Sequence, residues 1–154
     1  MVQLRRAERR YKLTTEDYGR LAAFRYALRS FLRFSEAAAA GVGLTGQHYQ
    51  ALLVVRACPD ERRLTINDLA QQLLIKHNSA VELVDRLARD GLLSREPSSL
   101  DRRKVELRLT LRGRQVLAEL AAVHRAELQR IGPILKRFFA EVSRPPKQNS
   151  GSGP

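Results

Sequence analysis

The sequence predicts a mainly α-helical protein that contains one small β-hairpin. Near both ends of the chain, apolar residues recur at three- and four-residue steps, which is the spacing of one helical face. Between these stretches lie shorter helical segments and then a segment that alternates apolar and polar residues, the pattern of a half-buried strand. The 154 residues, 44% of them apolar, suffice for a real core. We expect one domain, with surplus apolar surface for pairing with a second copy.

A long first helix is expected over about residues 16–39. Thr14 or Thr15 caps its start, and Gly41 and Gly43 end it. Its apolar stripe consists of Leu21, Phe24, Leu28, Phe31 and Leu32. The preceding residues 1–13 carry five bases and one acid, so we interpret them as a basic arm or a frayed helix start.

Two short helices are expected next. Thr45 caps the first and Pro59 ends it. The residues expected to face inward are Tyr49, Leu52, Leu53 and Val55. After the charged loop "PDERR", Thr65 opens the second helix over about residues 66–73. Asp68 lies three residues further on and supplies the acid half of a capping box.

A third short helix is expected over about residues 77–90, and Gly91 is a natural left-handed cap for its end. Its inward residues are expected to be Ala80, Leu83, Val84 and Leu87. The segments "LLSRE" and "KVELRLT" are predicted to be two strands, joined into a hairpin by the polar loop "PSSLDRR". In the second strand, one face is expected to carry Val105, Leu107 and Leu109, and the other Glu106 and Arg108.

Thr110 is expected to cap a long final helical region that extends to about residue 143. Its stripe consists of Leu117, Leu120, His124, Leu128, Ile131, Leu135, Phe138 and Val142. Gly132 and Pro133 interrupt it, because proline removes a backbone donor and clashes with the preceding turn. We therefore expect a kink or two consecutive helices. Residues 144–154 are expected to be a disordered tail.

The charge balance favours an anionic partner. Lys and Arg number 28 against 16 Asp and Glu, which gives a formal charge of +12. Nucleic acid is the leading candidate, because each phosphate that a base neutralises releases a counterion. A basic surface that merely contacts solvent is the alternative. No apolar run is long enough to span a bilayer and no signal-peptide core is present, so we expect a cytoplasmic protein without a membrane partner.

Residues that could support catalysis or metal binding are not arranged for either. Cys58 is the only cysteine, so an intrachain disulfide and a thiolate cluster are excluded. His48, His77 and His124 lie far apart, without the spacing of a motif such as HExxH. The motifs GxxxxGK[ST] and GxGxxG are absent. We expect no metal, no cofactor and no enzymatic activity.

Two short helices with a tight connection, followed by a charged hairpin, form a winged helix-turn-helix. At this point the sequence resembles the MarR family of bacterial transcription regulators, over about residues 20–140. Four segments in the family's order and spacing carry the resemblance, namely "LTGQHYQALLVV", "LTINDLAQQL", "SAVELVDRLARDGLLSR" and "DRRKVELRLTLRG". Two positions depart from the family's pattern. Leu74 stands where a turn Gly is common, and Ser98 where a wing Asp is common.

The resemblance implies a division of the chain into three functional parts. Residues 45–110 would form the winged helix-turn-helix, which binds DNA, and residues 14–44 and 111–143 would form a dimerisation region. The apolar stripes of the two flanking segments support a homodimer, because the DNA-binding lobe can cover only part of them. Packing of these helices on each other within one chain is the alternative.

The recognition helix is expected to supply base contacts from the residues that its core does not need. These are Lys76, His77, Asn78, Ser79, Glu82 and Arg86. Asn forms paired hydrogen bonds with adenine, and Lys or Arg binds guanine or the backbone. We favour His77, Asn78 and Ser79, because the N-terminal end of the helix points into the groove; the alternative is that Asn78 only caps the helix. Asp85 is expected to form an internal ion pair.

The wing candidates are Arg95, Asp101, Arg102, Arg103 and Lys104. By resemblance, Asp101 would hold an arginine in place, and Arg102 or Arg103 would extend into the narrow, negatively charged minor groove. An ordinary solvated turn is the alternative.

MarR-like proteins are typically homodimers that bind palindromic DNA sites, commonly as repressors released by small aromatic or phenolic ligands. The implied pocket lies between the dimerisation helices and the DNA-binding lobe. Its candidates are Tyr18, Arg25, Tyr26, His48 and Tyr49, which offer aromatic walls and polar groups for an anionic phenol. Ordinary packing is the alternative for each. Cys58 does not match the reactive cysteine of some relatives and is expected to be inert, and His124 is expected to be packed.

Together these observations predict a sequence-specific, dimeric DNA-binding regulator of the bacterial cytoplasm, associated with the nucleoid through DNA. We expect a repressor that a small ligand releases. The +12 charge and the basic arm also fit a nonspecific architectural DNA-binding protein. A pure protein-interaction module is a third reading. A regulator should prefer its operator over other DNA by about 10³-fold or more.

Overall fold

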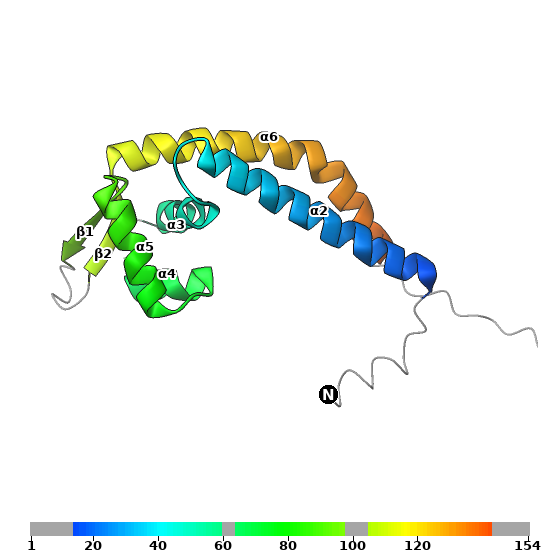
Figure 1. The fold of residues 1–154 in the computed structure, drawn as a ribbon, viewed down its shortest axis with the longest axis horizontal. Helices are drawn as coiled ribbons and strands as arrows, with labels where there is room; N and C mark the ends of the chain where they lie inside the picture. The colour runs from blue at the N-terminus through cyan, green and yellow to red at the C-terminus, as the bar shows by residue number, and fades with distance from the viewer. Residues whose placement is uncertain (1–13, 60–63, 98–104, 143–154) are drawn as a thin grey trace, which may run out of the picture. The chain divides into compact units, whose positions relative to one another are not determined.

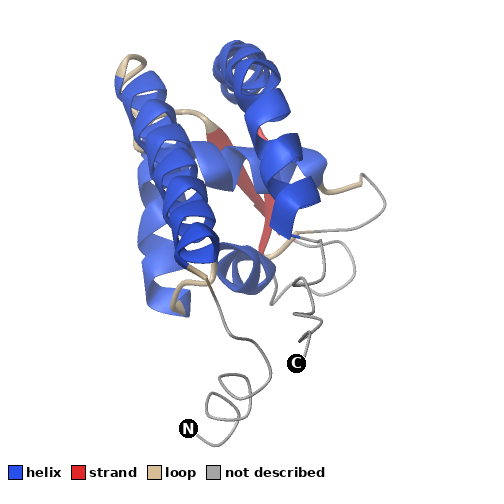
Figure 2. Ribbon diagram, turned by 90° about the vertical axis from the view of Figure 1, so that its right-hand side faces the viewer, coloured by secondary structure: helices blue, strands red, loops and turns tan. Residues whose placement is uncertain are grey.

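The computed structural model describes residues 14–59, 64–97 and 105–142. The elements in chain order are α2 (Thr15–Ala40), α3 (Gly46–Ala57), α4 (Ile66–Leu73), α5 (His77–Arg89), β1 (Leu93–Pro97), β2 (Val105–Leu109) and α6 (Leu111–Val142) (Figure 1). The predicted mainly helical fold with one hairpin is confirmed. Figure 2 shows the strands of that hairpin in red. The expected arm at 1–13 and tail at 144–154 lie outside the described residues.

The chain divides into two compact units. One, which we call the winged unit, is Leu32–Ala126. The other, which we call the helical unit, is Met1–Phe31 with Glu127–Pro154, of which residues 14–31 and 127–142 are described. No helix in the described part of the chain is both long and apolar enough to cross a membrane.

The start of α3 and the start of α4 are each fixed by a capping box. At α4, the Asp68 amide donates to Thr65 Oγ (3.2 Å) and the Thr65 amide donates to a carboxylate oxygen of Asp68 (2.9 Å). At α3, the His48 amide donates to Thr45 Oγ (3.2 Å), and the Thr45 amide donates to Nδ1 of His48 (3.3 Å). Both predicted caps are confirmed. These bonds satisfy amides that a helix start otherwise leaves without partners.

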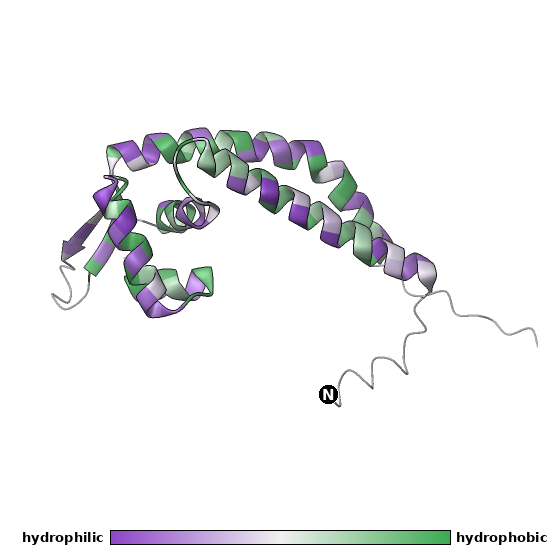
Figure 3. Cartoon of the chain, viewed as in Figure 1, coloured by the Kyte–Doolittle hydropathy of each residue, from purple (hydrophilic) through white to green (hydrophobic). Residues whose placement is uncertain are grey.

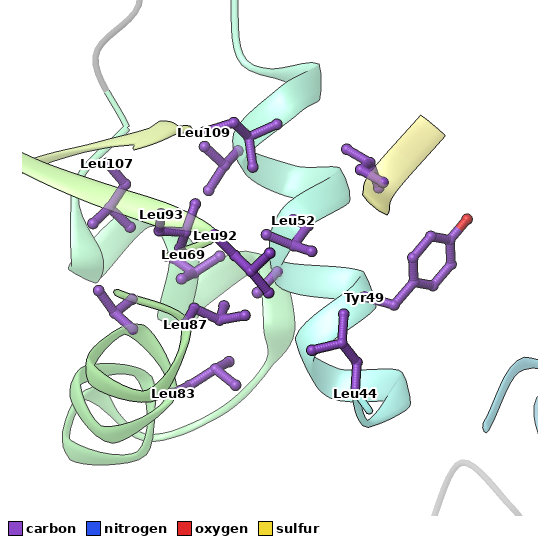
Figure 4. Close-up of a cluster of buried hydrophobic side chains, with 14 of the residues drawn as sticks. Leu44, Tyr49, Leu52, Leu69, Leu83, Leu87, Leu92, Leu93, Leu107 and Leu109 are labelled. Atoms are coloured by element: carbon purple, nitrogen blue, oxygen red, sulfur yellow. The ribbon is translucent and has the colours of Figure 1, made fainter. Parts of the chain in front are cut away.

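The core of the winged unit is formed mainly by leucines (Figure 4). The largest fully buried side chains are Leu52, Leu69, Val84 and Leu87, from three successive helices. Burial of each contributes about 2 kcal/mol of hydrophobic free energy. The four inward residues predicted for α5 are buried. In α3, Tyr49, Leu52 and Val55 are buried as predicted, but Leu53 is 37% exposed, so its assignment to the core was wrong.

The two strands pair antiparallel, with Leu93 opposite Leu109 and Arg95 opposite Leu107. The predicted alternation in β2 was wrong at its start, because Glu106 is only 4% exposed whereas Val105 is 38% exposed. The reason is a third segment beside β2. The Leu107 amide donates to the Leu64 carbonyl (2.9 Å), and Thr65 forms a β-bridge with Glu106. The chain just before α4 therefore covers this part of the strand.

The start of α6 packs directly on the chain that leads into β1. Thr110 Oγ donates to the Gly91 carbonyl (2.7 Å) and accepts from the Gly113 amide (2.9 Å), so its predicted role as a cap is confirmed. A Cβ at Gly113 would lie 2.0 Å from the Leu92 carbonyl oxygen. Only glycine permits this approach. Further on, α6 continues through Pro133 as one helix, so the alternative of two consecutive helices was wrong.

The described residues of the helical unit include an aromatic cluster and several exposed apolar side chains. The rings of Phe24 and Phe138 stack at 4.4 Å between centroids, and Phe139 meets Phe24 edge-on. Large apolar side chains still face solvent in this unit, namely those of Tyr18, Leu21, Tyr26, Leu28, Leu128, Ile134 and Phe139. Figure 3 shows apolar and polar residues interleaved along α2 and α6.

Candidate nucleic-acid interface

The exposed face of α5, together with its N-cap residue, carries all six residues that were predicted from the sequence to contact bases. Lys76, His77, Asn78, Ser79, Glu82 and Arg86 are each exposed. The opposite face is fixed in the core by Ala80, Leu83, Val84 and Leu87. Because these four recur at helical spacing, they occupy one face of α5, and the polar candidates lie on the opposite face. The polar row is thus presented on a helix whose rotation is set by packing.

The N-terminal end of α5 is open. Lys76 is the N-cap, with φ −68° and ψ 149°, and its side chain makes no capping hydrogen bond. Asn78 lies inside the first turn, so the alternative that Asn78 serves as the cap was wrong. The first turn contains no acidic residue. The first amides of a helix and its dipole favour an anion, so this end suits a phosphate or the electronegative edge of a base.

The turn before α5 has an uncommon backbone. Leu74 adopts the left-handed conformation, with φ 55° and ψ 40°, and its amide contacts the carbonyl oxygens of Ala70 and Gln71. A side chain there costs about 1–2 kcal/mol relative to glycine, because Cβ crowds the carbonyl oxygen. The turn keeps a left-handed geometry although the residue is not Gly. The sequence signal for this strain was the departure at Leu74 from the glycine common in the family.

The hairpin is attached to α5 by an ion pair. Arg95 on β1 places Nη2 at 2.7 Å from a carboxylate oxygen of Asp85 and 3.5 Å from the Val81 carbonyl oxygen. The predicted internal pairing of Asp85 is confirmed. Arg95, a wing candidate for DNA contact, thus points at the recognition helix. Nearby, Arg108 and Glu96 pair across the strands at 3.0 Å. The remaining wing candidates, Asp101, Arg102, Arg103 and Lys104, lie outside the described residues.

The five candidates for a ligand pocket lie in different units. Tyr18, Arg25 and Tyr26 are exposed in the helical unit, whereas His48 and Tyr49 are buried in the winged unit. Burial lowers the pKa of His48 below its ordinary 6.5, the charge of Asp90 opposes this and the charge of Arg86 adds to it. Burial also raises the pKa of the Tyr49 hydroxyl. Sequence reasoning did not foresee that Nδ1 of His48 caps α3, because histidine rarely fills that position.

His124 is buried beside Tyr49, as its place on the apolar stripe predicted. Nδ1 lies 2.7 Å from the Leu120 carbonyl oxygen and Nε2 lies 2.8 Å from Ser35 Oγ. The Tyr49 ring stacks on the imidazole at 4.1 Å between centroids. The Leu120 carbonyl oxygen can only accept, so Nδ1–H donates to it, and Nε2 forms a hydrogen bond with the Ser35 hydroxyl. Both polar atoms of the ring are therefore satisfied within the winged unit.

A separate hollow of about 450 Å³ lies in the winged unit between the end of α3, the hairpin and the start of α6. Its described lining includes Arg56, Arg114 and Glu106, and none of the five pocket candidates. Cys58 also lines it, and that thiol is partly buried. Among the described residues, no group of three or more His, Cys, Asp or Glu side chains could hold a metal ion.

The chain is similar to proteins of the MarR family. Residues 42–104 match the model of the MarR family. The HTH-type transcriptional repressor YetL of Bacillus subtilis (strain 168) is 29% identical over 102 residues, which are 66% of this chain and 59% of that protein. This chain thus spans less than two thirds of that relative's length.

Two solved structures illustrate the likeness in fold. The transcriptional repressor CouR, bound to a 23-mer DNA duplex, has a TM-score of 0.64 and 25% identity, over 87% of this chain and 100% of that one. AbsC from Streptomyces coelicolor, a MarR family transcriptional regulator, has a TM-score of 0.66 and 21% identity, over 88% and 86% of the two chains. The predicted winged helix-turn-helix fold and the predicted resemblance to the family are confirmed.

Proposed function

We propose that this chain, which has a winged helix-turn-helix fold and matches the MarR family model over residues 42–104, is a sequence-specific, DNA-binding transcriptional repressor. The observation that carries the proposal is the exposed polar row at the open N-terminal end of α5, on a helix whose opposite face is fixed in the core. Such a helix enters the major groove of DNA with a defined rotation. The +12 charge supports a polyanionic partner.

Each residue of the polar row has a proposed role. Asn78 reads adenine through paired hydrogen bonds, and Ser79 contacts a base or a phosphate. Lys76 and Arg86 neutralise phosphates on either side of the groove, and His77 lies beside them at the helix start. Glu82 repels phosphate, so it accepts from a cytosine amino group or lies clear of the backbone. In the wing, Arg102 and Arg103 reach the minor groove, and Asp101 and Lys104 support them.

We propose that the protein acts as a homodimer formed by residues 14–44 and 111–143. The support is the number of apolar side chains that remain exposed on α2 and α6, including Tyr26 and Ile134. A second copy would remove this surface from water. Two α5 helices related by a twofold axis then read a palindrome with half-sites about 34 Å apart, one turn of DNA.

We propose further that a small aromatic or phenolic anion releases the DNA. Tyr18, Arg25, Tyr26, His48 and Tyr49 are the candidates for its site. The five lie partly on the helices proposed to dimerise and partly in the winged unit. The affinity for the ligand would therefore depend on dimerisation.

Selection of bound duplexes from a random-sequence library, at physiological salt, tests the proposed function. A regulator enriches a palindrome and discriminates against unrelated DNA by about 10³-fold or more. Asn78→Ala should lose about 1–3 kcal/mol of operator affinity and relax the preference for one base pair. Gln50→Ala removes an exposed amide from α3 instead and should leave both unchanged.

Strong binding with no enriched sequence would contradict a specific regulator. It would favour the second candidate, a nonspecific architectural DNA-binding protein, for which the +12 charge is the supporting observation. In that case affinity would fall steeply with salt, and Asn78→Ala would have no effect on sequence preference. Absence of binding at physiological salt would contradict both candidates.

A further inference from the structure

Leu74 combines two features that folding alone does not favour. It is the one residue other than glycine with a positive φ in the described part of the chain. Its side chain is 93% exposed, more than any other large apolar side chain described. A left-handed leucine is strained, and an exposed one gains nothing from burial. In the isolated fold, the leucine side chain therefore makes no contribution to stability that would offset this strain.

The turn itself does not need a leucine. The Leu74 amide meets the carbonyl oxygens of Ala70 and Gln71, and the Ile75 amide donates to the Ala70 carbonyl at 3.0 Å. These contacts use only backbone atoms, so glycine or asparagine would make them with less strain. Strained residues that the structure does not require are found preferentially at functional positions.

The position of Leu74 relates the side chain to the proposed DNA-reading row. It lies two residues before Lys76, the N-cap of α5, and the exposed residues His77 and Asn78 follow directly. The turn and the helix start are therefore brought to the DNA together. Of the groups that face a protein in the major groove, the C5-methyl of thymine is the apolar one, and aliphatic side chains contact it.

We propose that Leu74 contacts the C5-methyl group of a thymine at the edge of each half-site and thereby contributes to sequence preference. The inference rests on the proposed function, and it adds an apolar contact to a surface otherwise made of polar residues. In the complex the leucine side chain leaves water, which offsets the strain of the turn.

The test uses the palindrome that the wild-type protein selects from a random library. Duplexes in which a single thymine at a time is replaced by deoxyuridine lack only that one methyl group. Wild-type affinity should fall by roughly fourfold when the replaced thymine is at either of two positions related by the symmetry of the palindrome, the effect of withdrawing one methyl group from an apolar contact. Leu74→Gly and Leu74→Asn should bind the thymine duplex more weakly by at least this factor and should no longer distinguish thymine from deoxyuridine there.

Stability separates this effect from a folding defect. Leu74→Gly and Leu74→Asn relieve the left-handed strain, so each should unfold at a temperature no lower than the wild type while binding DNA less well. Leu74→Met keeps an apolar side chain and should retain the thymine preference. Leu53→Ala is the matched control, because Leu53 is 37% exposed on α3, outside the proposed DNA-reading row and the proposed dimerisation helices, and its loss should leave the preference intact.

Four outcomes are decisive. Loss of the thymine preference in Leu74→Gly, with its retention in Leu53→Ala, supports the contact. A wild-type protein that ignores every deoxyuridine replacement, or a Leu74→Gly variant that keeps the wild-type preference, overturns it while the proposed function stands. If the wild-type protein selects no sequence, the proposed function fails, and the contact fails with it.

Discussion

A single methyl group added at Gly113 should separate α6 from the chain that enters β1. The added Cβ would lie 2.0 Å from the Leu92 carbonyl oxygen and 3.0 Å from its carbon, both backbone atoms. To reach an acceptable contact, the two segments must move apart by about 1 Å. Leu92 cannot yield easily, because its side chain is buried, its amide donates to Leu87 and its carbonyl accepts from the Thr110 amide at 3.1 Å.

The size of the effect follows from these contacts. Forcing an extra carbon into a packed region costs about 1–3 kcal/mol, and weakening the Thr110–Leu92 hydrogen bond costs about 1 kcal/mol more. Alanine recovers about 1 kcal/mol, because it is the better helix former. Gly113→Ala should therefore lower the free energy of unfolding by about 1–3 kcal/mol. For a chain of this size that is a fall in Tm of roughly 2–12 °C.

Gly132→Ala is the matched control in the same helix. A Cβ at Gly132 meets nothing within 4 Å, so the variant should gain up to about 1 kcal/mol from helix propensity alone. Both variants are compared with the wild type by urea unfolding followed by circular dichroism, at one fixed protein concentration because association shifts apparent stability. If Gly113→Ala is as stable as Gly132→Ala, the close packing of α6 on Leu92 is wrong.

Two further predictions concern the hairpin and pH. Arg95 and Asp85 are replaced by alanine, singly and together, and the free energies of unfolding in urea are compared in a double-mutant cycle. The coupling free energy should be about 0.2–1 kcal/mol, because the pair is partly exposed. Strictly additive effects would argue against the ion pair. The folded state holds His48 neutral, so the unfolded chain binds more protons, and stability should fall as the pH drops below about 6.5. His48→Gln keeps an acceptor for the Thr45 amide and should flatten this dependence, and an unchanged pH profile would show that another group causes it.

The parts of the fold that could be predicted from sequence are those set by nearby residues. The helix α4 begins where the Thr65 and Asp68 pair requires, because a capping box acts within four residues. The exposed row on α5 followed from the spacing of residues such as Leu83 and Leu87, since helical periodicity fixes which face is buried. For the same reason the candidate DNA-reading residues could be named from sequence.

The parts that sequence reasoning missed depend on contacts between distant segments. Glu106 is buried because the chain near Leu64 and Thr65 runs beside β2, and alternation within the strand carries no sign of this. Leu53 lies within the unbroken apolar run of residues 51–55 in α3, so the sequence pattern does not show which face it occupies, and its exposure is decided by packing. The role of the wing residues Arg102 and Arg103 stays a prediction.

The links between the hairpin and its neighbours limit how the protein can be switched. β2 bonds to the Leu64 carbonyl just before α4, and β1 holds Asp85 of α5 through Arg95. A rotation of the hairpin relative to α4 and α5 would therefore break these contacts. In the proposed repressor, a signal that frees the operator is therefore expected to move the hairpin and the recognition helix together. In the proposed dimer, such a movement changes the tilt or the separation of the two lobes, so that one of them loses its register with the groove.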